Sequence, residues 1–189
     1  YMARGRGEIP PTFTVPAMNL RVMTFDAASA VFRTAHSINA GAFIFEIARS
    51  EIGYTNQRPA EYVSTLLAAA IAEGHRGPVF IQGDHFQISA SRYKADPDAE
   101  VQTVKDLIDE AVPAGFYNID VDTSTLVDIS FDDVHEQQAV NTRLSAELTH
   151  YIRSMEPDDV TVSVGGEIGE VGGHNSNEQE LRAYVEGYN

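Results

Sequence analysis

The side chains best suited to chemistry in this sequence are the neighbours Asp84 and His85, which directly follow the apolar run 78–83. A neutral imidazole is a good zinc ligand, and a carboxylate beside it can act as a general acid or base. A strand that runs straight into this pair would place both groups at one end of the fold. The residues alone also allow a plainer alternative, in which Asp84 caps a turn beside a surface histidine.

Polar side chains also follow the other apolar runs of the chain. They are Asn19 after the first run, Glu46 and Ser50 at the second, Asp120, Asp122 and Ser124 at the fourth, and Glu167 at the fifth. In α/β folds the functional groups lie at the carboxyl ends of parallel strands. Because every expected strand ends in this way, the pattern favours a common mouth around a divalent cation.

Two of these strand ends carry excess negative charge. Asp120 and Asp122 alternate along a strand and so share one side, where like charges require a cation or hydrogen-bond donors. Glu167 lies in the glycine-rich segment 164–173, which lacks the Gly-Lys-Ser/Thr ending of a phosphate-binding loop. We therefore expect no nucleotide site there and predict that Glu167 faces a cation. The alternatives are a half-exposed strand with a polar face and a loop with solvated carboxylates.

The composition excludes several classes of function. The 189 residues include 13 Lys+Arg against 28 Asp+Glu, a net charge of −15, and no cysteine. Disulfides, thiolate catalysis and cysteine-bound zinc are excluded, so a metal must be held by His, Asp, Glu or water. An acidic field repels phosphodiester backbones, no apolar run approaches the roughly 18 residues of a membrane span, and the first residues lack the pattern of a secretory signal. We expect a cytoplasmic protein with neither nucleic acid nor a membrane as partner.

Short apolar runs alternate with longer segments of helical period along the chain. The expected strands are 13–20, 42–48, 78–83, 116–121 and 160–164. Strict alternation with helices predicts a parallel sheet with right-handed crossovers. The nearly all-apolar run 42–48 is typical of a strand that is covered on both faces.

Two architectures fit this alternation. A five-stranded doubly wound sheet suits 189 residues. A (β/α)8 barrel typically needs about 250 residues, so this chain would supply only its first five units. Length favours the open sheet, whereas the polar strand ends favour the barrel, because only there do they converge on one axis. We therefore predict an α/β fold of TIM-type barrel truncated to about five β-α units, as one incomplete domain spanning 1–189, with the doubly wound sheet as the alternative.

The remaining histidines and the lysines contribute little to this picture. Four histidines lie in helical segments or at their ends, away from strand carboxyl ends, and are interpreted as structural or solvated: His36, His75, His135 and His150. His174, within the glycine-rich segment, is a further candidate. The two lysines, Lys94 and Lys105, do not lie at strand ends, so a Schiff-base mechanism has no candidate residue.

Five short motifs occur in order through nearly the whole chain. They are Val15-Pro16-Ala17-Met18-Asn19, Ser50 with Gly53 and Tyr54, Asp84-His85, Val121-Asp122-Thr123-Ser124, and Glu167-Ile168-Gly169 with Gly172-Gly173. Together they resemble the class II, metal-dependent fructose-bisphosphate and tagatose-bisphosphate aldolase family. Each motif is short and weak evidence by itself, but five motifs in the same order as in the family make the resemblance specific.

The resemblance implies a (β/α)8 barrel, a zinc ion and a role in carbohydrate metabolism. The implied reaction is the reversible cleavage of a ketose bisphosphate, of the fructose or tagatose 1,6-bisphosphate type, to dihydroxyacetone phosphate and an aldehyde. His85 would be a zinc ligand, and Asp84 would move the proton on the hydroxyl whose C–C bond breaks. Asp122 and Glu167 would form an accessory position for a second cation or orient the zinc shell.

The resemblance also implies contacts for the phosphorylated ketose. Ser50 would contact a substrate phosphate, and Asn19 would line the pocket. Phosphates need positively charged partners in an acidic protein, and the nearest such side chains in the sequence are Arg49 and Arg58, which flank the Ser50 loop.

The sequence departs from the family in two respects. The other two zinc histidines come from strands beyond the fifth, and an acidic residue that often follows the Gly-Gly pair is replaced by His174 and Asn175. We therefore expect a truncated chain that holds zinc weakly by itself and a homo-oligomer at full length. The alternative function is a non-catalytic aldolase-like subunit or a sugar-phosphate-binding module.

Overall fold

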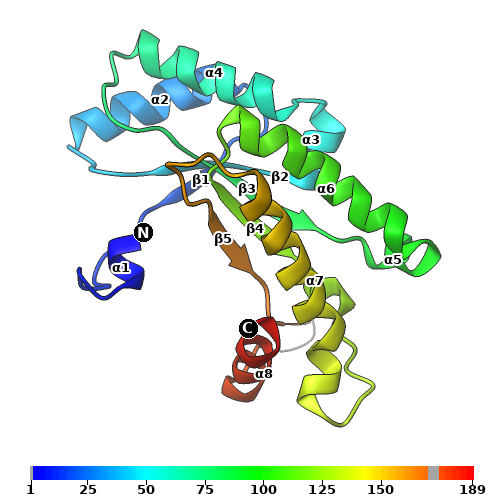
Figure 1. The fold of residues 1–189 in the computed structure, drawn as a ribbon. Helices are drawn as coiled ribbons and strands as arrows, with labels where there is room; N and C mark the ends of the chain where they lie inside the picture. Colours follow the sequence, from blue (N-terminus) through cyan, green and yellow to red (C-terminus); the bar gives the residue numbers. More distant parts are fainter. Residues whose placement is uncertain (1, 170–174) are drawn as a thin grey trace.

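The computed structural model describes residues 2–169 and 175–189 and contains one sheet of five parallel strands (Figure 1). The strands are β1 (Ala17–Asn19), β2 (Ile44–Ala48), β3 (Phe80–Gln87), β4 (Asn118–Asp122) and β5 (Ser163–Gly166). Their order in the sheet is β1-β2-β3-β4-β5, with every neighbouring pair parallel. A doubly wound sheet reverses its strand order at a switch point, whereas a barrel adds each strand beside the last. The α/β prediction is confirmed, and the strand order is that of the TIM-type barrel.

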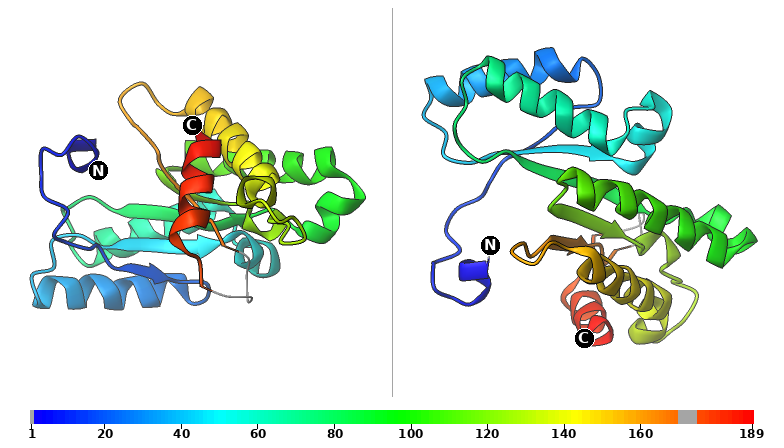
Figure 2. Two further views of the ribbon diagram at one scale, coloured as in Figure 1. Left: turned by 90° about the horizontal axis from the view of Figure 1, so that it is seen from below. Right: turned by 45° about the horizontal axis from the view of Figure 1, so that its top comes forward.

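The helices of the described residues are α1 (Met2–Gly5), α2 (Thr24–Ser37), α3 (Arg49–Thr55), α4 (Pro59–Ala72), α5 (Ala90–Ala95), α6 (Pro97–Ala114), α7 (Val134–Met155) and α8 (Glu178–Tyr188), with a 3-10 turn η1 (Ser124–Leu126). The long helices form one curved layer outside the sheet, whereas α1 lies apart from them near the N-terminus (Figure 1). Helices α2, α4, α6, α7 and α8 each pack against the next in chain order, as the two views of Figure 2 show. This single winding direction leaves the carboxyl ends of all five strands on one side.

Local sequence explains where the main helices begin and end. Pro59 and Pro97 stand in the first turns of α4 and α6, where a missing N–H is harmless. Gly115 ends α6 with a φ of 108°, a left-handed conformation that glycine adopts without strain. Helix α8 is capped by Asn177 and Glu180 in a reciprocal capping box.

The two faces of the sheet differ in polarity. Alternate strand residues are buried beneath the helices, among them Phe45, Ile47, Ile81, Ile119 and Val121. The residues between them form a polar row across the sheet, paired in register as Asn19, Glu46, Gln82, Asn118 and Ser163. The expectation that 42–48 is covered by apolar packing on both faces is therefore wrong, because Glu46 is only partly buried and belongs to the polar row.

Within 2–169 and 175–189, no helix combines the length and the apolar character that crossing a membrane requires.

Candidate functional site

A β-bulge in β3 brings Asp84 and His85 to the same side of the sheet. Adjacent residues of a regular strand point to opposite faces. Here the pairing register with β4 shifts between Gly83 and Phe86, and His85 has a φ of 44°. Gly83 and Phe86 are buried, whereas Asp84 is half-buried and His85 is exposed. The bulge thus points two neighbouring functional groups away from the core, as bulges near active sites often do.

Gly83 makes this bulge possible. A Cβ at position 83 would lie 2.5 Å from the ring of Phe86, which real Cβ atoms do not tolerate. The ring of Phe86 folds over the bare Cα and fills the core where the strand is interrupted. The left-handed backbone at His85 is unusual for a residue with a side chain and is typical of functional sites.

The bulge completes a group of three possible metal ligands. Asp84, His85 and Asp120 each offer one ligand atom, and these atoms all lie within 4.8 Å of one another. Nδ1 of His85 lies 3.0 Å from Oδ1 of Asp84, which leaves Nε2 available. Oε1 of Glu167 lies 3.8 Å from Nε2. One imidazole nitrogen with two or three carboxylates is a donor set that suits a divalent cation such as zinc.

The carboxylates of this group repel one another, and burial together with this repulsion raises the pKa values of Asp120 and Glu167. Burial, together with the carboxylates of Glu167, Asp122 and Asp84, raises the pKa of Asp120 to about 6, while His85 opposes this shift. Burial, followed by neighbouring carboxylates, also raises the pKa of Glu167. A bound cation would relieve this repulsion.

His85 responds to the same carboxylates in the opposite sense. Burial lowers the pKa of His85, but the hydrogen bond to Asp84 and the charges of Asp84, Asp120 and Asp122 outweigh this effect and raise it above its usual value. The carboxylates that repel one another therefore favour the protonated form of His85.

The structure brings together three of the predicted site residues and separates the others. Asp84, His85 and Glu167 line one cavity of about 310 Å³ over the ends of β3, β4 and β5. Asp120 lines the same cavity, although only Asp122 of this strand was predicted as a ligand. The alternation of Asp120 with Asp122 was the available signal, but it did not distinguish between the two.

Asp122, a predicted ligand, lies outside the group of Asp84, His85 and Asp120. Its side chain is buried, with the residue 1% exposed. Oδ1 accepts hydrogen bonds from the backbone N–H and the hydroxyl of Ser124, and Oδ2 accepts one from the side chain of Gln87. Asp122 thus links the ends of β3 and β4 through its two oxygens, and its role as a ligand stays a prediction, whereas Asp120 is the β4 carboxylate that meets Asp84 and His85.

Asn19 lies at the end of β1, outside the cavity that Asp84 and His85 line and outside the larger cavity around Ser50. Its Nδ2 donates to Oε2 of Glu51 at 2.7 Å, and its Oδ1 is buried without a hydrogen-bond partner among the described residues. His174 and the Gly172-Gly173 pair lie outside the described residues.

Gly165 provides the room that the Asp120 carboxylate occupies. The two residues are partners in the β4–β5 register, and a Cβ at position 165 would lie 2.8 Å from Oδ1 of Asp120. We expect Gly165→Ala to displace this carboxylate and weaken Co²⁺ binding about tenfold, with little change in melting temperature. Titration followed by visible absorption measures this effect. Gly53→Ala, at a position with open space around the added Cβ, is the control, and equal affinities in the two variants would contradict the prediction.

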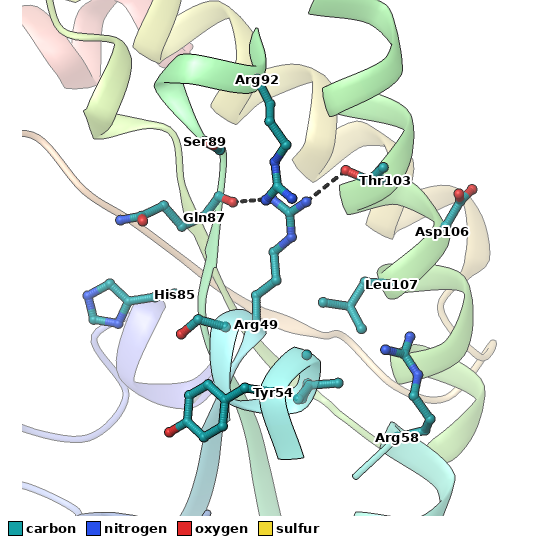
Figure 3. A pocket seen from close by; sticks show the side chains of 13 residues that line it. Arg49, Tyr54, Arg58, His85, Gln87, Ser89, Arg92, Thr103, Asp106 and Leu107 are labelled. Atoms are coloured by element: carbon teal, nitrogen blue, oxygen red, sulfur yellow. Dashed lines mark hydrogen bonds between the residues drawn. The ribbon is translucent and has the colours of Figure 1, made fainter. Parts of the chain in front are cut away.

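Ser50 lines a second, larger cavity of about 550 Å³ between α3, the end of β3 and α6 (Figure 3). This cavity also contains Arg49, Arg58 and Arg92, and His85 lies at its border. In Figure 3 the guanidinium groups of Arg49 and Arg92 lie beside each other at the centre, and the ring of His85 points away from them. The arginine cavity and the metal-ligand group therefore adjoin each other on either side of the end of β3.

Two of these arginines share a single carboxylate. Nη1 of Arg49 lies 2.7 Å from Oε1 of Glu100, and Nε of Arg92 lies 3.0 Å from Oε2. Glu100 is only 2% exposed, and although burial raises its pKa, the hydrogen bonds from Arg49 and Ser89 and the charges of both arginines lower it overall. Arg58 is paired separately with Glu110. Asp106 also lines the cavity, so its three arginines are balanced by Glu100, Glu110 and Asp106.

The sequence interpretation missed Arg92 and Glu100. Arg92 lies 43 positions after Arg49 in the chain, so the sequence does not indicate that the two meet. Glu100 precedes Val104 and Ile108 by four and eight positions, and this place on the apolar face of the helix was the signal that could have identified a buried carboxylate.

Fold and site together define an α/β barrel-type chain with possible metal ligands at the carboxyl ends of its strands. The sequence profile of the family described as fructose-bisphosphate aldolase class-II matches residues 11–187. The chain therefore belongs to the class-II fructose-bisphosphate aldolase family.

Comparison with solved structures agrees with this fold. A crystal structure described as a probable tagatose 6 phosphate kinase from Sinorhizobium meliloti 1021 matches with a TM-score of 0.64 and 17% sequence identity. The match covers 93% of this chain and 44% of that chain, so this chain spans less than half the length of that protein. Comparison with curated protein sequences finds no significant match.

Proposed function

We propose that this chain supplies part of the active site of a metal-dependent aldolase. The reaction would be the reversible cleavage of a ketose bisphosphate of the fructose or tagatose 1,6-bisphosphate type to dihydroxyacetone phosphate and an aldehyde. The observation that carries the proposal is the meeting of Asp84, His85 and Asp120 at the carboxyl ends of the strands, in a chain of the class-II aldolase family.

The residues present fit a divalent cation such as zinc. His85 would bind through Nε2, with Asp120 and Glu167 supplying oxygen, and catalytic zinc sites use three protein ligands and keep one position open. When bound, the cation polarises the ketone carbonyl and stabilises the negative charge that develops on the triose half. The raised pKa values of Asp120 and Glu167 are consistent with a site that is incomplete without positive charge.

Asp84 is the proposed base for the C–C bond cleavage. The hydrogen bond between its Oδ1 and Nδ1 of His85 fixes the carboxylate, and within residues 2–169 and 175–189 Oδ2 has no hydrogen-bond partner. Asp84 would take the proton from the hydroxyl on the carbon that becomes the aldehyde. The electron pair of the broken C–C bond then stays on the triose half, which regains a proton to give dihydroxyacetone phosphate.

The arginine cavity supports a phosphorylated substrate. It gathers three arginine side chains in a chain of net charge −15, and it adjoins the proposed metal site along β3. Ser50 lies at the same cavity and can donate a hydrogen bond to a phosphate oxygen.

Arg92 is the residue with which to test this phosphate assignment. Its side chain is 65% exposed, whereas Arg49 is mostly buried and also holds Thr103. We expect Arg92→Ala to weaken binding of a sugar phosphate about tenfold, because a charge-assisted contact is lost, and to change the melting temperature little. Arg76→Ala, outside the cavity lining, is the control. Isothermal titration with fructose 1,6-bisphosphate measures the effect, and unchanged affinity would remove the cavity from the proposal.

The proposed reaction is tested directly by metal analysis and an aldol assay. The full-length protein that contains this chain is loaded with Zn²⁺, and cleavage of fructose and tagatose 1,6-bisphosphates is followed, with Asp84→Asn and His85→Ala measured alongside. We expect metal-dependent turnover that both variants abolish. Turnover that survives in both variants would disprove the proposed roles. Binding of the sugar phosphate without turnover would instead support a binding module.

A further inference from the structure

Two buried amide side chains of α7 hold the segment that follows β5. Nδ2 of Asn141 donates to the backbone carbonyl of Glu167 at 2.9 Å, and Nε2 of Gln138 donates to the backbone carbonyl of Ile168 at 2.6 Å. Asn141 is 0% exposed and Gln138 is 2% exposed. A third hydrogen bond, from Nδ2 of Asn141 to Oε1 of Gln138 at 2.9 Å, joins the two amides.

The same network reaches the end of β4. The hydroxyl of Thr123 lies 2.5 Å from Oδ1 of Asn141 and 2.8 Å from the hydroxyl of Ser145, and all three residues are buried. Thr123 directly follows Asp122, and Glu167 directly follows β5. Asn141 therefore connects the ends of two neighbouring strands through one side chain.

These amides bind backbone carbonyls that lie beyond the last hydrogen-bonded pair of β4 and β5. The β4–β5 pairing ends with Val121 and Gly166, so the carbonyl of Glu167 lies beyond the strand ladder. Buried polar groups are expensive unless they are satisfied, and a fully satisfied buried network rigidifies the segments that it joins. Asparagine is also a poor residue for a helix interior, so Asn141 is explained by these contacts and not by helix propensity.

We propose that Gln138 and Asn141 are positioning residues, which hold the backbone at Glu167 so that its carboxylate faces His85. Oε1 of Glu167 lies 3.8 Å from Nε2 of His85, and a shift of about 1 Å at a ligating group is enough to impair a site. The part of this inference that concerns a cation rests on the proposed function. The part that concerns the backbone at Glu167 does not.

The test uses variants that keep the shape of each side chain. Asn141→Asp and Gln138→Glu each replace the donating NH₂ group with oxygen, which then faces a carbonyl. Ser145→Ala is the matched control, because Ser145 is equally buried and bonds Thr123 but makes no hydrogen bond to the described residues Glu167 and Ile168. Hydrogen–deuterium exchange of residues 163–169 and Co²⁺ affinity are measured for each folded variant.

We expect exchange at residues 163–169 to accelerate and Co²⁺ affinity to fall about tenfold in Asn141→Asp and Gln138→Glu, but not in Ser145→Ala. In a Glu167→Gln background, Asn141→Asp should no longer change the Co²⁺ affinity, because the positioned ligand is gone. Unchanged exchange in the two amide variants would overturn the inference. If the unmutated chain binds no Co²⁺, the proposed function fails, and the exchange data alone decide the role of the amides.

Discussion

Replacing His85 by alanine should reduce the affinity for Zn²⁺ or Co²⁺ at least about 100-fold, because it removes the one nitrogen donor of the group and leaves only carboxylates. Nδ1 of His85 is already bonded to Asp84, so Nε2 is the atom that ligation requires. Titration calorimetry with Zn²⁺, or visible absorption with Co²⁺, measures the loss. His135→Ala, at an exposed position of α7 far from β3 in the sequence, is the control, and a similar loss there would contradict a local site.

A second substitution separates ligation from backbone strain at this position. His85 has a φ of 44°, which glycine adopts freely and a residue with a side chain does not. We expect His85→Gly to lose cation binding as His85→Ala does, yet to be more stable than His85→Ala by about 1 kcal/mol. Urea unfolding of the metal-free variants measures this difference. Equal stability would show that the left-handed backbone stores no strain.

Asp120→Asn should stabilise the metal-free chain and at the same time remove most of its cation affinity. Burial and three neighbouring carboxylates raise the pKa of Asp120 to about 6, so at pH 7.5 the folded state holds an unfavourable charge. Removing that charge should stabilise the chain by about 1–2 kcal/mol, allowing for its partial exposure. The Asp120 carboxylate is favourable only when a cation is bound, so the same substitution should raise the stability of the metal-free chain and lower its cation affinity.

The pH dependence of this effect has a definite sign. The folded chain binds the Asp120 proton below about pH 6, whereas the unfolded chain loses it above its usual value of 3.8. The folded state therefore carries more protons between these limits, and the stability of the metal-free chain rises as the pH falls through this window. We expect the gain from Asp120→Asn to be present at pH 7.5 and to shrink towards pH 5, as measured by melting in EDTA.

Asp122→Asn is the matched control, with the opposite expected sign. Asp122 is fully buried, and its two oxygens accept hydrogen bonds from Ser124 and Gln87. Replacing one oxygen by an NH₂ group leaves a buried donor unsatisfied, which should destabilise the chain by about 1–3 kcal/mol. A stabilising Asp122→Asn together with a destabilising Asp120→Asn would reverse the assignment made here.

The alternation of apolar runs and helical segments in the sequence was sufficient to predict the α/β architecture. Apolar runs and helical segments alternate, and a parallel strand that must be reached by a crossover needs the helix that each segment supplies. Ser176 and Gln179 have the spacing of a capping box in the sequence, but the capping box of α8 lies one residue later, at Asn177 and Glu180. Both pairs have capping chemistry, and only the path of the chain into the helix distinguishes them.

What the sequence by itself determined is the kind of site: an Asp-His pair and several carboxylates at the carboxyl ends of parallel strands. Tertiary structure decided which of them meet. A strand period of two places Asp84 and His85 on opposite faces, and only the bulge after Gly83 brings both to one side. Asp120 and Asp122 point to the same side of β4 in the sequence pattern, so the sequence does not distinguish them. The pairing register and burial show that Asp120 is the one that meets Asp84 and His85.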